Sequence, residues 1–322
     1  MKVKPPPRPR QRTKIKPPVK PLSISQKEGA KKTTTNKKTM SSSPSPPPVF
    51  RPGNTAIITG GASGIGRALA RKCRNYGMRV LIADWNDSLL AQLDDDNDND
   101  IIPFKMDVGK LDDWARLKSK VDEVFGGKIN LLALNAGVGA KSTWTDASSF
   151  HTVLDTNLFG VINGITTFLP PIKTTASTAP SAIIITGSKQ GITNPPGNPA
   201  YNASKAAVKA LAEHLSFDLR SETQLSVHLL VPGWTYTGMT GGGTARTKPD
   251  GAWTAEQVVD YLEDKMDQGK FYVVCPDNDV SEETDRKRML WSVGDVVEGR
   301  PPLTRWRDEW KGKAQEWMNN QK

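Results

Sequence analysis

The sequence predicts an α/β protein with a single doubly wound parallel sheet and helices on both faces, and two observations lead to this fold class. Short apolar runs rich in β-branched residues recur along the chain, and segments with helical spacing separate most of them. Polar or glycine residues follow most of these runs directly, where open parallel sheets bind their ligands. The expected strands are residues 56–59, 80–83, 101–106, 131–135, 182–186, 226–231 and 271–274.

Composition divides the chain into three parts. Residues 1–50 hold 13 of the 44 Lys and Arg residues but one of the 34 acidic residues, so this segment carries a net charge of +12 and the rest of the chain −2. Such a proline-rich segment cannot bury a core, and we expect residues 1–50 to be a disordered basic tail. Residues 51–280 are expected to form the α/β domain, and residues 281–322 a helical and loop extension of it.

Three interpretations of the tail stay open. Clustered Lys and Arg attract polyanions, which favours contact with nucleic acid or an anionic membrane. A transit peptide for an organelle is also poor in acids, although the prolines oppose an amphipathic helix. A merely solubilising extension is the plainest interpretation. Cys73 and Cys275 lack CxxC spacing and suit a reducing compartment, so we expect a cytoplasmic protein, with no metal site.

A glycine-rich turn follows the first expected strand. Residues 60–66 read Gly-Gly-Ala-Ser-Gly-Ile-Gly, and a helical pattern comes next. Missing side chains let the backbone approach phosphate oxygens, and N–H groups at the start of a helix bind anions. The spacing differs from G-x-G-x-x-G, so the turn alone is not specific. It indicates a pyrophosphate site at Gly60, Ser63, Gly64, Ile65 and Gly66.

An acidic residue ends the second expected strand. Asp84 lies eighteen residues after Gly66, and Trp85 rather than an arginine follows it. A carboxylate at this place can accept hydrogen bonds from the ribose hydroxyls of a dinucleotide and repels a 2′-phosphate. The pattern therefore favours NAD, with NADP as the alternative. Arg67 is the residue that could argue for NADP, although we expect it on the helix after the turn.

Tyr201 and Lys205 lie four residues apart at the start of a segment with helical spacing, so they share one helix face. A free phenol titrates near ~10 and is a poor acid–base group at neutral pH. A nearby ammonium favours the phenolate and lowers the pKa of the phenol. The same spacing also occurs on ordinary helix surfaces, so further motifs must decide.

With those motifs, the chain resembles the short-chain dehydrogenase/reductase family, and the resemblance covers roughly residues 49–274. It implies a Rossmann-type fold that binds a nicotinamide cofactor. The glycine turn and the Tyr-xxx-Lys pair match the family. The other matching residues, in the family's order and spacing, are Asp107, Val108, Asn135, Ala136, Gly137, Asn157, Ser188, Pro232 and Gly233.

The resemblance implies roles for four catalytic residues. Tyr201 would donate or accept the proton of the substrate oxygen, and Lys205 would bind the nicotinamide ribose and lower the pKa of Tyr201. Ser188 would hydrogen-bond the substrate oxygen, while Asn157 would position a water for proton relay. Two neighbours depart from the family pattern, because Leu134 replaces a common asparagine and Gly187 a common serine.

The resemblance also implies the remaining cofactor contacts. Asp107 and Val108 would flank the adenine, and residues 135–137 would lie beneath its ribose. Thr235 and Thr237, after Pro232 and Gly233, would meet the carboxamide and the phosphates. The lid over the substrate is expected in residues 238–251.

The function expected from these motifs is an NAD(P)-dependent oxidoreductase that interconverts a secondary alcohol and a ketone or aldehyde. The alternative is a non-catalytic sensor or scaffold that binds a dinucleotide on the same fold. The resemblance further implies a homodimer or homotetramer, assembled through the helices that bear Asn157 and Tyr201.

Overall fold

The computed structural model describes residues 49–94, 101–241 and 247–321. The expected tail of residues 1–50 therefore lies outside the described residues, except for its last two. Val49 and Phe50 are buried, and the Phe50 ring stacks on Tyr76 with the centroids 5.8 Å apart. The Asn54 side-chain amide donates to the carbonyl of Val49 over 2.9 Å. These two residues thus pack with the α/β domain, because their apolar side chains complete its core.

All seven expected strands are present, each within one residue of its expected bounds, and the predicted fold class is confirmed. They form one parallel sheet in the order β3-β2-β1-β4-β5-β6-β7. The order reverses between β1 and β4, where loops leave the sheet in opposite directions. The strands are β1 (Thr55–Thr59), β2 (Arg79–Asp84), β3 (Ile101–Lys105), β4 (Leu131–Leu134), β5 (Ser181–Thr186), β6 (Leu225–Val231) and β7 (Tyr272–Val274).

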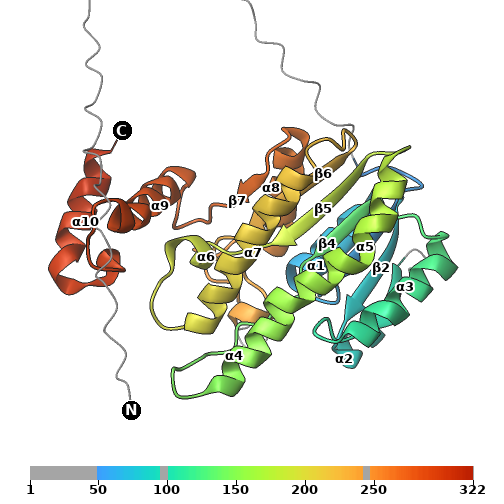
Figure 1. Ribbon diagram of the computed structural model, residues 1–322, viewed down its shortest axis with the longest axis horizontal. Helices are drawn as coiled ribbons and strands as arrows, with labels where there is room; N and C mark the ends of the chain where they lie inside the picture. The colour runs from blue at the N-terminus through green and yellow to red at the C-terminus, as the bar shows by residue number, and fades with distance from the viewer. Residues whose placement is uncertain (1–48, 95–100, 242–246, 322) are drawn as a thin grey trace, which may run out of the picture. The chain divides into compact units, whose positions relative to one another are not determined.

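Helices cover both faces of the sheet, and successive strand residues pack into opposite layers. Ile58 faces a core cluster shared with α1 (Gly64–Asn75), α2 (Asp87–Asp94) and α8 (Ala255–Asp267). Ile57 faces the opposite cluster, which can be followed in Figure 1 beneath α3 (Leu111–Phe125), α5 (Gly160–Ala176) and α7 (Pro199–Asp218). Burial on both faces explains why the strands are apolar throughout rather than alternating.

Shorter elements lie around the carboxyl ends of the strands. They are α4 (Ala147–Leu154), the π-helical turn η1 (Asp155–Phe159), α6 (Gln190–Thr193) and the 3-10 turn η2 (Gly238–Thr240). After β7 the chain continues into α9 (Glu282–Val297), η3 (Thr304–Trp306) and α10 (Asp308–Asn320), drawn in red in Figure 1.

Polar contacts within the extension after β7 hold its elements together. The Trp291 indole donates to the Thr304 hydroxyl over 2.8 Å, and the Thr304 N–H donates to Asp295 over 3.0 Å. Arg300 pairs with the same carboxylate at 3.0 Å and lies over the Trp291 ring. These contacts join α9 to η3.

Two glycine-to-alanine substitutions test how tightly α5 packs on β4 and α3. A Cβ added at Gly164 of α5 would clash with Leu134 and lie 2.7 Å from the Trp114 ring. We expect Gly164→Ala to lower the free energy of unfolding by about 1–3 kcal/mol, because overpacking forces neighbours from their positions. Gly312 of α10 has open space, so Gly312→Ala should instead stabilise by about 0.5–1 kcal/mol. Urea denaturation measures both, and equal effects would contradict this account.

Candidate active site

A cavity of about 750 Å³ opens at the carboxyl ends of the strands and spans the β1–β4 reversal. It brings together residues that the sequence places more than 170 positions apart. The predicted site residues that line it are Gly60, Ser63, Gly64, Ile65, Asp84, Asp107, Val108, Asn135, Ala136, Gly137, Ser188, Tyr201, Lys205, Pro232, Gly233, Thr235 and Thr237. Two predicted residues, Gly66 and Asn157, lie behind this lining.

The glycine-rich turn packs directly on the end of β4. Gly60 has a φ of 62°, and a Cβ there would lie 2.8 Å from the Ala136 Cα. A Cβ at Gly66 would clash with the Gly60 carbonyl oxygen, which explains why Gly66 belongs to the turn without lining the cavity. The turn therefore presents bare backbone and the start of α1 to the cavity. This arrangement fits a pyrophosphate.

Asp84 is held in place at the end of β2 and is 7% exposed. One carboxylate oxygen accepts the Ala62 N–H and the other accepts the Asn86 N–H, both over 3.1 Å. Each oxygen keeps a further lone pair for a ribose hydroxyl. Trp85 also lines the cavity, whereas Arg67 lies on α1 as expected and lines a separate cavity. These positions fit a dinucleotide ribose beside Asp84.

Asn157 supports the cavity wall from behind. It is fully buried in η1, where its amide oxygen accepts the Val138 N–H over 2.8 Å. Its amide nitrogen donates to the Val138 carbonyl and to the Ser204 hydroxyl of α7. A Cβ at Gly137 would lie 3.2 Å from Asn157 Oδ1, so glycine leaves room for this contact. The sequence indicated a helix here, and the π-helical form is a finding of the structure.

Tyr201 and Lys205 lie in the first turns of α7, which begins at Pro199. Proline suits this position because its missing N–H needs no partner there. Lys205 is 3% exposed, and its Nζ donates to the Thr186 carbonyl over 2.8 Å. Nζ lies 5.9 Å from the centroid of the Tyr201 ring. The helix thus places the ammonium and the phenol at one end of the cavity.

Burial sets the pKa directions of this pair. It lowers the pKa of Lys205 to about 8, since the charged form loses its solvation. It also raises the pKa of Tyr201, which a hydrogen bond with Ser188 partly opposes. The net direction for Tyr201 is opposite to the lowering expected from a neighbouring ammonium. Desolvation of the phenolate is the larger effect on this pKa.

Ser188 follows β5 and its hydroxyl accepts the Gln190 N–H over 3.2 Å. It faces the cavity close to Tyr201. The expected lid is described in part, since η2 lines the cavity while residues 242–246 lie outside the described residues. Lining residues that the sequence analysis did not name as site residues include Asn86, Leu89, Met106, Val138, Gly139, Thr152, Thr156, Met239 and Thr240. Their proximity to strand ends was a usable signal for Asn86, Met106 and Val138.

Across the residues that the structure describes, no helix has the length and apolar character required to cross a membrane.

The chain is similar to known proteins. The sequence pattern of the family described as short chain dehydrogenase matches residues 54–247. A cis-2,3-dihydrobiphenyl-2,3-diol dehydrogenase of Paraburkholderia xenovorans is 33% identical over 175 residues, covering 52% of this chain and 61% of that protein. The chain thus spans less than two thirds of that relative.

Two further proteins are similar over more of their length. A 1-deoxy-11-beta-hydroxypentalenate dehydrogenase of Streptomyces avermitilis is 30% identical over 228 residues, covering 68% of this chain and 83% of that protein. A solved structure from Burkholderia phymatum, a short chain dehydrogenase/reductase in complex with NAD, has a TM-score of 0.70 and 27% identity. It covers 79% of this chain and 97% of its own.

The buried lysine predicts a pH-dependent stability. With a pKa of about 8 when folded and 10.5 when unfolded, Lys205 binds a proton in the unfolded chain alone between these values. The contribution of Lys205 to the free energy of unfolding is largest above pH 10.5, decreases as the pH falls, and is constant below about pH 8. As the pH falls from 10.5 to about 8, the free energy of unfolding of the wild type should decrease by about 1.4 kcal/mol per pH unit relative to that of Lys205→Met. Urea denaturation from pH 7.5 to 10.5 measures this, and a constant difference would contradict it.

Proposed function

The chain belongs to the short chain dehydrogenase family, and from this premise we propose that it is an oxidoreductase interconverting a secondary alcohol and a carbonyl compound with a nicotinamide cofactor. The observation that carries the proposal is one cavity that joins the glycine-rich turn and Asp84 to a serine, a tyrosine and a buried lysine. When bound, the cofactor would supply or accept the hydride. Gly60, Asp84 and Thr237 are among the residues that would hold it.

Tyr201 would move the proton at the substrate oxygen. In carbonyl reduction its phenol would donate the proton, and in alcohol oxidation its phenolate would accept one. The raised pKa of Tyr201 keeps the phenol protonated at neutral pH, which suits the reduction direction. The Ser188 hydroxyl would donate to the same oxygen and stabilise the charge that develops there.

Lys205 would act through its charge and its fixed position. Its Nζ is anchored to the Thr186 carbonyl, so the ammonium can donate its other hydrogens to a nicotinamide ribose. The same charge would favour the Tyr201 phenolate when alcohol is oxidised. Asn157 would hold Val138 and α7 at fixed positions beside the substrate. We include a proton relay through Asn157 in this proposal.

NAD is the proposed cofactor, rather than NADP. The anchored Asp84 carboxylate would accept the ribose hydroxyls and would repel a 2′-phosphate at the same place. We also propose that the protein assembles as a homo-oligomer through the helices around Asn157 and Tyr201. Exposed Phe159 and Phe217 on η1 and α7 support an apolar contact there.

Removing the Tyr201 hydroxyl tests the reaction. We expect Tyr201→Phe to lower kcat/KM by at least about 100-fold while NAD still binds, because proton transfer loses its group. The measurement is NADH absorbance with the full chain, across a panel of secondary alcohols and ketones.

Tyr272→Phe is the matched control, since the Tyr272 hydroxyl bonds to Glu213 on the surface, away from the cavity. Its activity should equal that of the wild type. Normal turnover by Tyr201→Phe would refute the proposed role. A wild type that binds NAD but turns over no substrate would favour the non-catalytic sensor.

Replacing the acid of β2 tests the cofactor preference. Asp84→Ser should shift the ratio of NAD to NADP dissociation constants at least about tenfold toward NADP, because it replaces a charged acceptor by a weaker neutral one and removes the repulsion of a 2′-phosphate. Isothermal titration calorimetry measures both constants. Asp87→Asn, which changes an exposed acid of α2, is the control and should leave the ratio unchanged. Preference of the wild type for NADP would contradict the assignment.

A further inference from the structure

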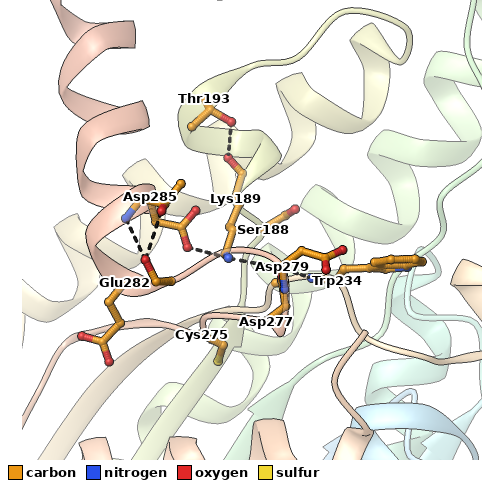
Figure 2. A network of polar contacts seen from close by, with 12 residues as sticks. Ser188, Lys189, Thr193, Trp234, Cys275, Asp277, Asp279, Glu282 and Asp285 are labelled. Carbon is orange, nitrogen blue, oxygen red and sulfur yellow. Dashed lines mark hydrogen bonds and ion pairs between the residues drawn. The ribbon is translucent and has the colours of Figure 1, made fainter. Parts of the chain in front are cut away.

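Lys189, the residue directly after Ser188, turns away from the cavity and pairs with two buried carboxylates. Its Nζ lies 2.5 Å from Asp285 Oδ2 and 3.5 Å from Asp277 Oδ2. The Lys189 side chain is 15% exposed and those of the two acids are 5% and 4% exposed. Figure 2 shows the ammonium between the two acids, with Ser188 alongside. We call these three residues the Lys189 cluster.

Backbone hydrogen bonds hold Ser188 and Lys189 in the same turn. The Ser188 carbonyl accepts the Gly191 N–H, and the Lys189 carbonyl accepts both the N–H and the hydroxyl of Thr193. A Cβ at Gly191 would lie 2.5 Å from the carbonyl carbon of Lys205, so α6 packs directly on the backbone of α7. A displacement of Lys189 would therefore change the direction of the Ser188 hydroxyl.

Asp277 links Lys189 to the loop after β6, which lines the cavity. Its Oδ2, the atom nearest Lys189, also accepts the Trp234 N–H over 3.0 Å. A Cβ at Gly233 would lie 2.7 Å from this oxygen and 2.9 Å from the Pro276 carbonyl, so the two segments are in close contact. Gly233 and Thr235, which flank Trp234, line the cavity. Asp277 thus holds the loop after β6.

Asp285 links Lys189 to the extension after β7. It lies in the first turn of α9, whose start is capped by the Ser281 hydroxyl accepting the Thr284 N–H. Burial raises the pKa of Asp285, and Lys189 and Arg288 oppose this rise. Burial lowers the pKa of Arg305 to about 10, and the charge of Asp285 in turn opposes this lowering. The second carboxylate, Asp277, faces the same ammonium, so Lys189 separates two like charges in a poorly solvated place.

We propose that Lys189 is a positioning residue for the reaction: through Asp277 and Asp285 it sets the orientation of Ser188 against the loop at residues 233–235 and makes α9 part of the catalytic unit. The inference rests on the proposed function. No cluster atom needs to touch the substrate, since a small displacement of an orienting group lowers the rate of a reaction that depends on alignment.

Lys189→Met is the first test, in the full-length protein. We expect kcat for the alcohol to fall about 10- to 100-fold with a smaller change in KM, because alignment matters most in the transition state. The dissociation constant for NAD should rise less than kcat falls, because the loop after β6 loses its support while Asp84 and the glycine-rich turn keep theirs. Unchanged kcat in a folded variant would overturn the proposal.

Lys287→Met is the matched control. Lys287 pairs with Glu283 on the same helix α9 and its side chain is similarly covered, at 16% exposure. This variant should keep the wild-type kcat. An equal loss of kcat in both variants would show a general effect of α9 and would overturn the specific role of Lys189.

A double-mutant cycle separates the ion pair from other effects. Asp285→Asn should also lower kcat, and its combination with Lys189→Met should be no slower than Lys189→Met alone, because the second change removes an interaction that is already lost. Additive losses would overturn the coupling. Asp285→Asn also provides the kinetic test where Lys189→Met fails to fold.

Hydrogen–deuterium exchange gives a readout that needs no turnover. The Trp234 N–H is bound to Asp277, so Lys189→Met should speed exchange in the peptide over residues 233–237 at least about tenfold, with no change in β1. Unchanged exchange would overturn the link between the two loops. If the wild type turns over no substrate, the proposed function fails, and this exchange measurement still decides whether Lys189 holds the loops.

Discussion

The carboxyl ends of three strands are tied together by three polar side chains, and the cavity depends on this junction. The Thr59 hydroxyl accepts the N–H groups of Asn135 and Ala136. The Asn135 amide in turn donates to the carbonyls of Thr59 and Gly60 and accepts the Thr186 hydroxyl. Because the sheet order reverses here, the ends of β1, β4 and β5 must be held by side chains while the loops diverge. The glycine-rich turn packs against Asn135, and the Thr186 carbonyl accepts the hydrogen bond that anchors Lys205.

Lys205 is buried and Lys189 half-buried close to this junction, and the protein stabilises the two lysines differently. Lys205 is held by a carbonyl, and its lowered pKa reflects the cost of keeping it charged. Lys189 is held by two carboxylates, which compensate its charge and join distant segments. A buried group with a shifted pKa in a cleft is typical of a site that does chemistry, whereas a paired buried ion is typical of one that fixes geometry. The two lysines therefore suit different tasks.

The extension after β7 lies beyond the segment that matches the family, which ends at residue 247. It is closed by the contacts of Trp291, Asp295 and Thr304, and it joins the rest of the domain through Asp285. The family segment thus supplies the cofactor cleft, the serine, the tyrosine and the lysine. In the positioning role proposed for Lys189, Asp277 and Asp285, which lie beyond residue 247, would help to orient that serine.

The sequence by itself determined the fold class, the strands to within a residue, and the residues at the strand ends, because apolar periodicity and glycine turns are local properties of the chain. The tertiary structure decided what local patterns cannot encode. It buries Val49 with the core, converts the turn at Asp155–Phe159 to a π-helix, and raises the pKa of Tyr201. It also brings Lys189 to Asp285, 96 positions away. Each of these depends on solvent exclusion and on contacts between distant segments, which exist once the chain has folded.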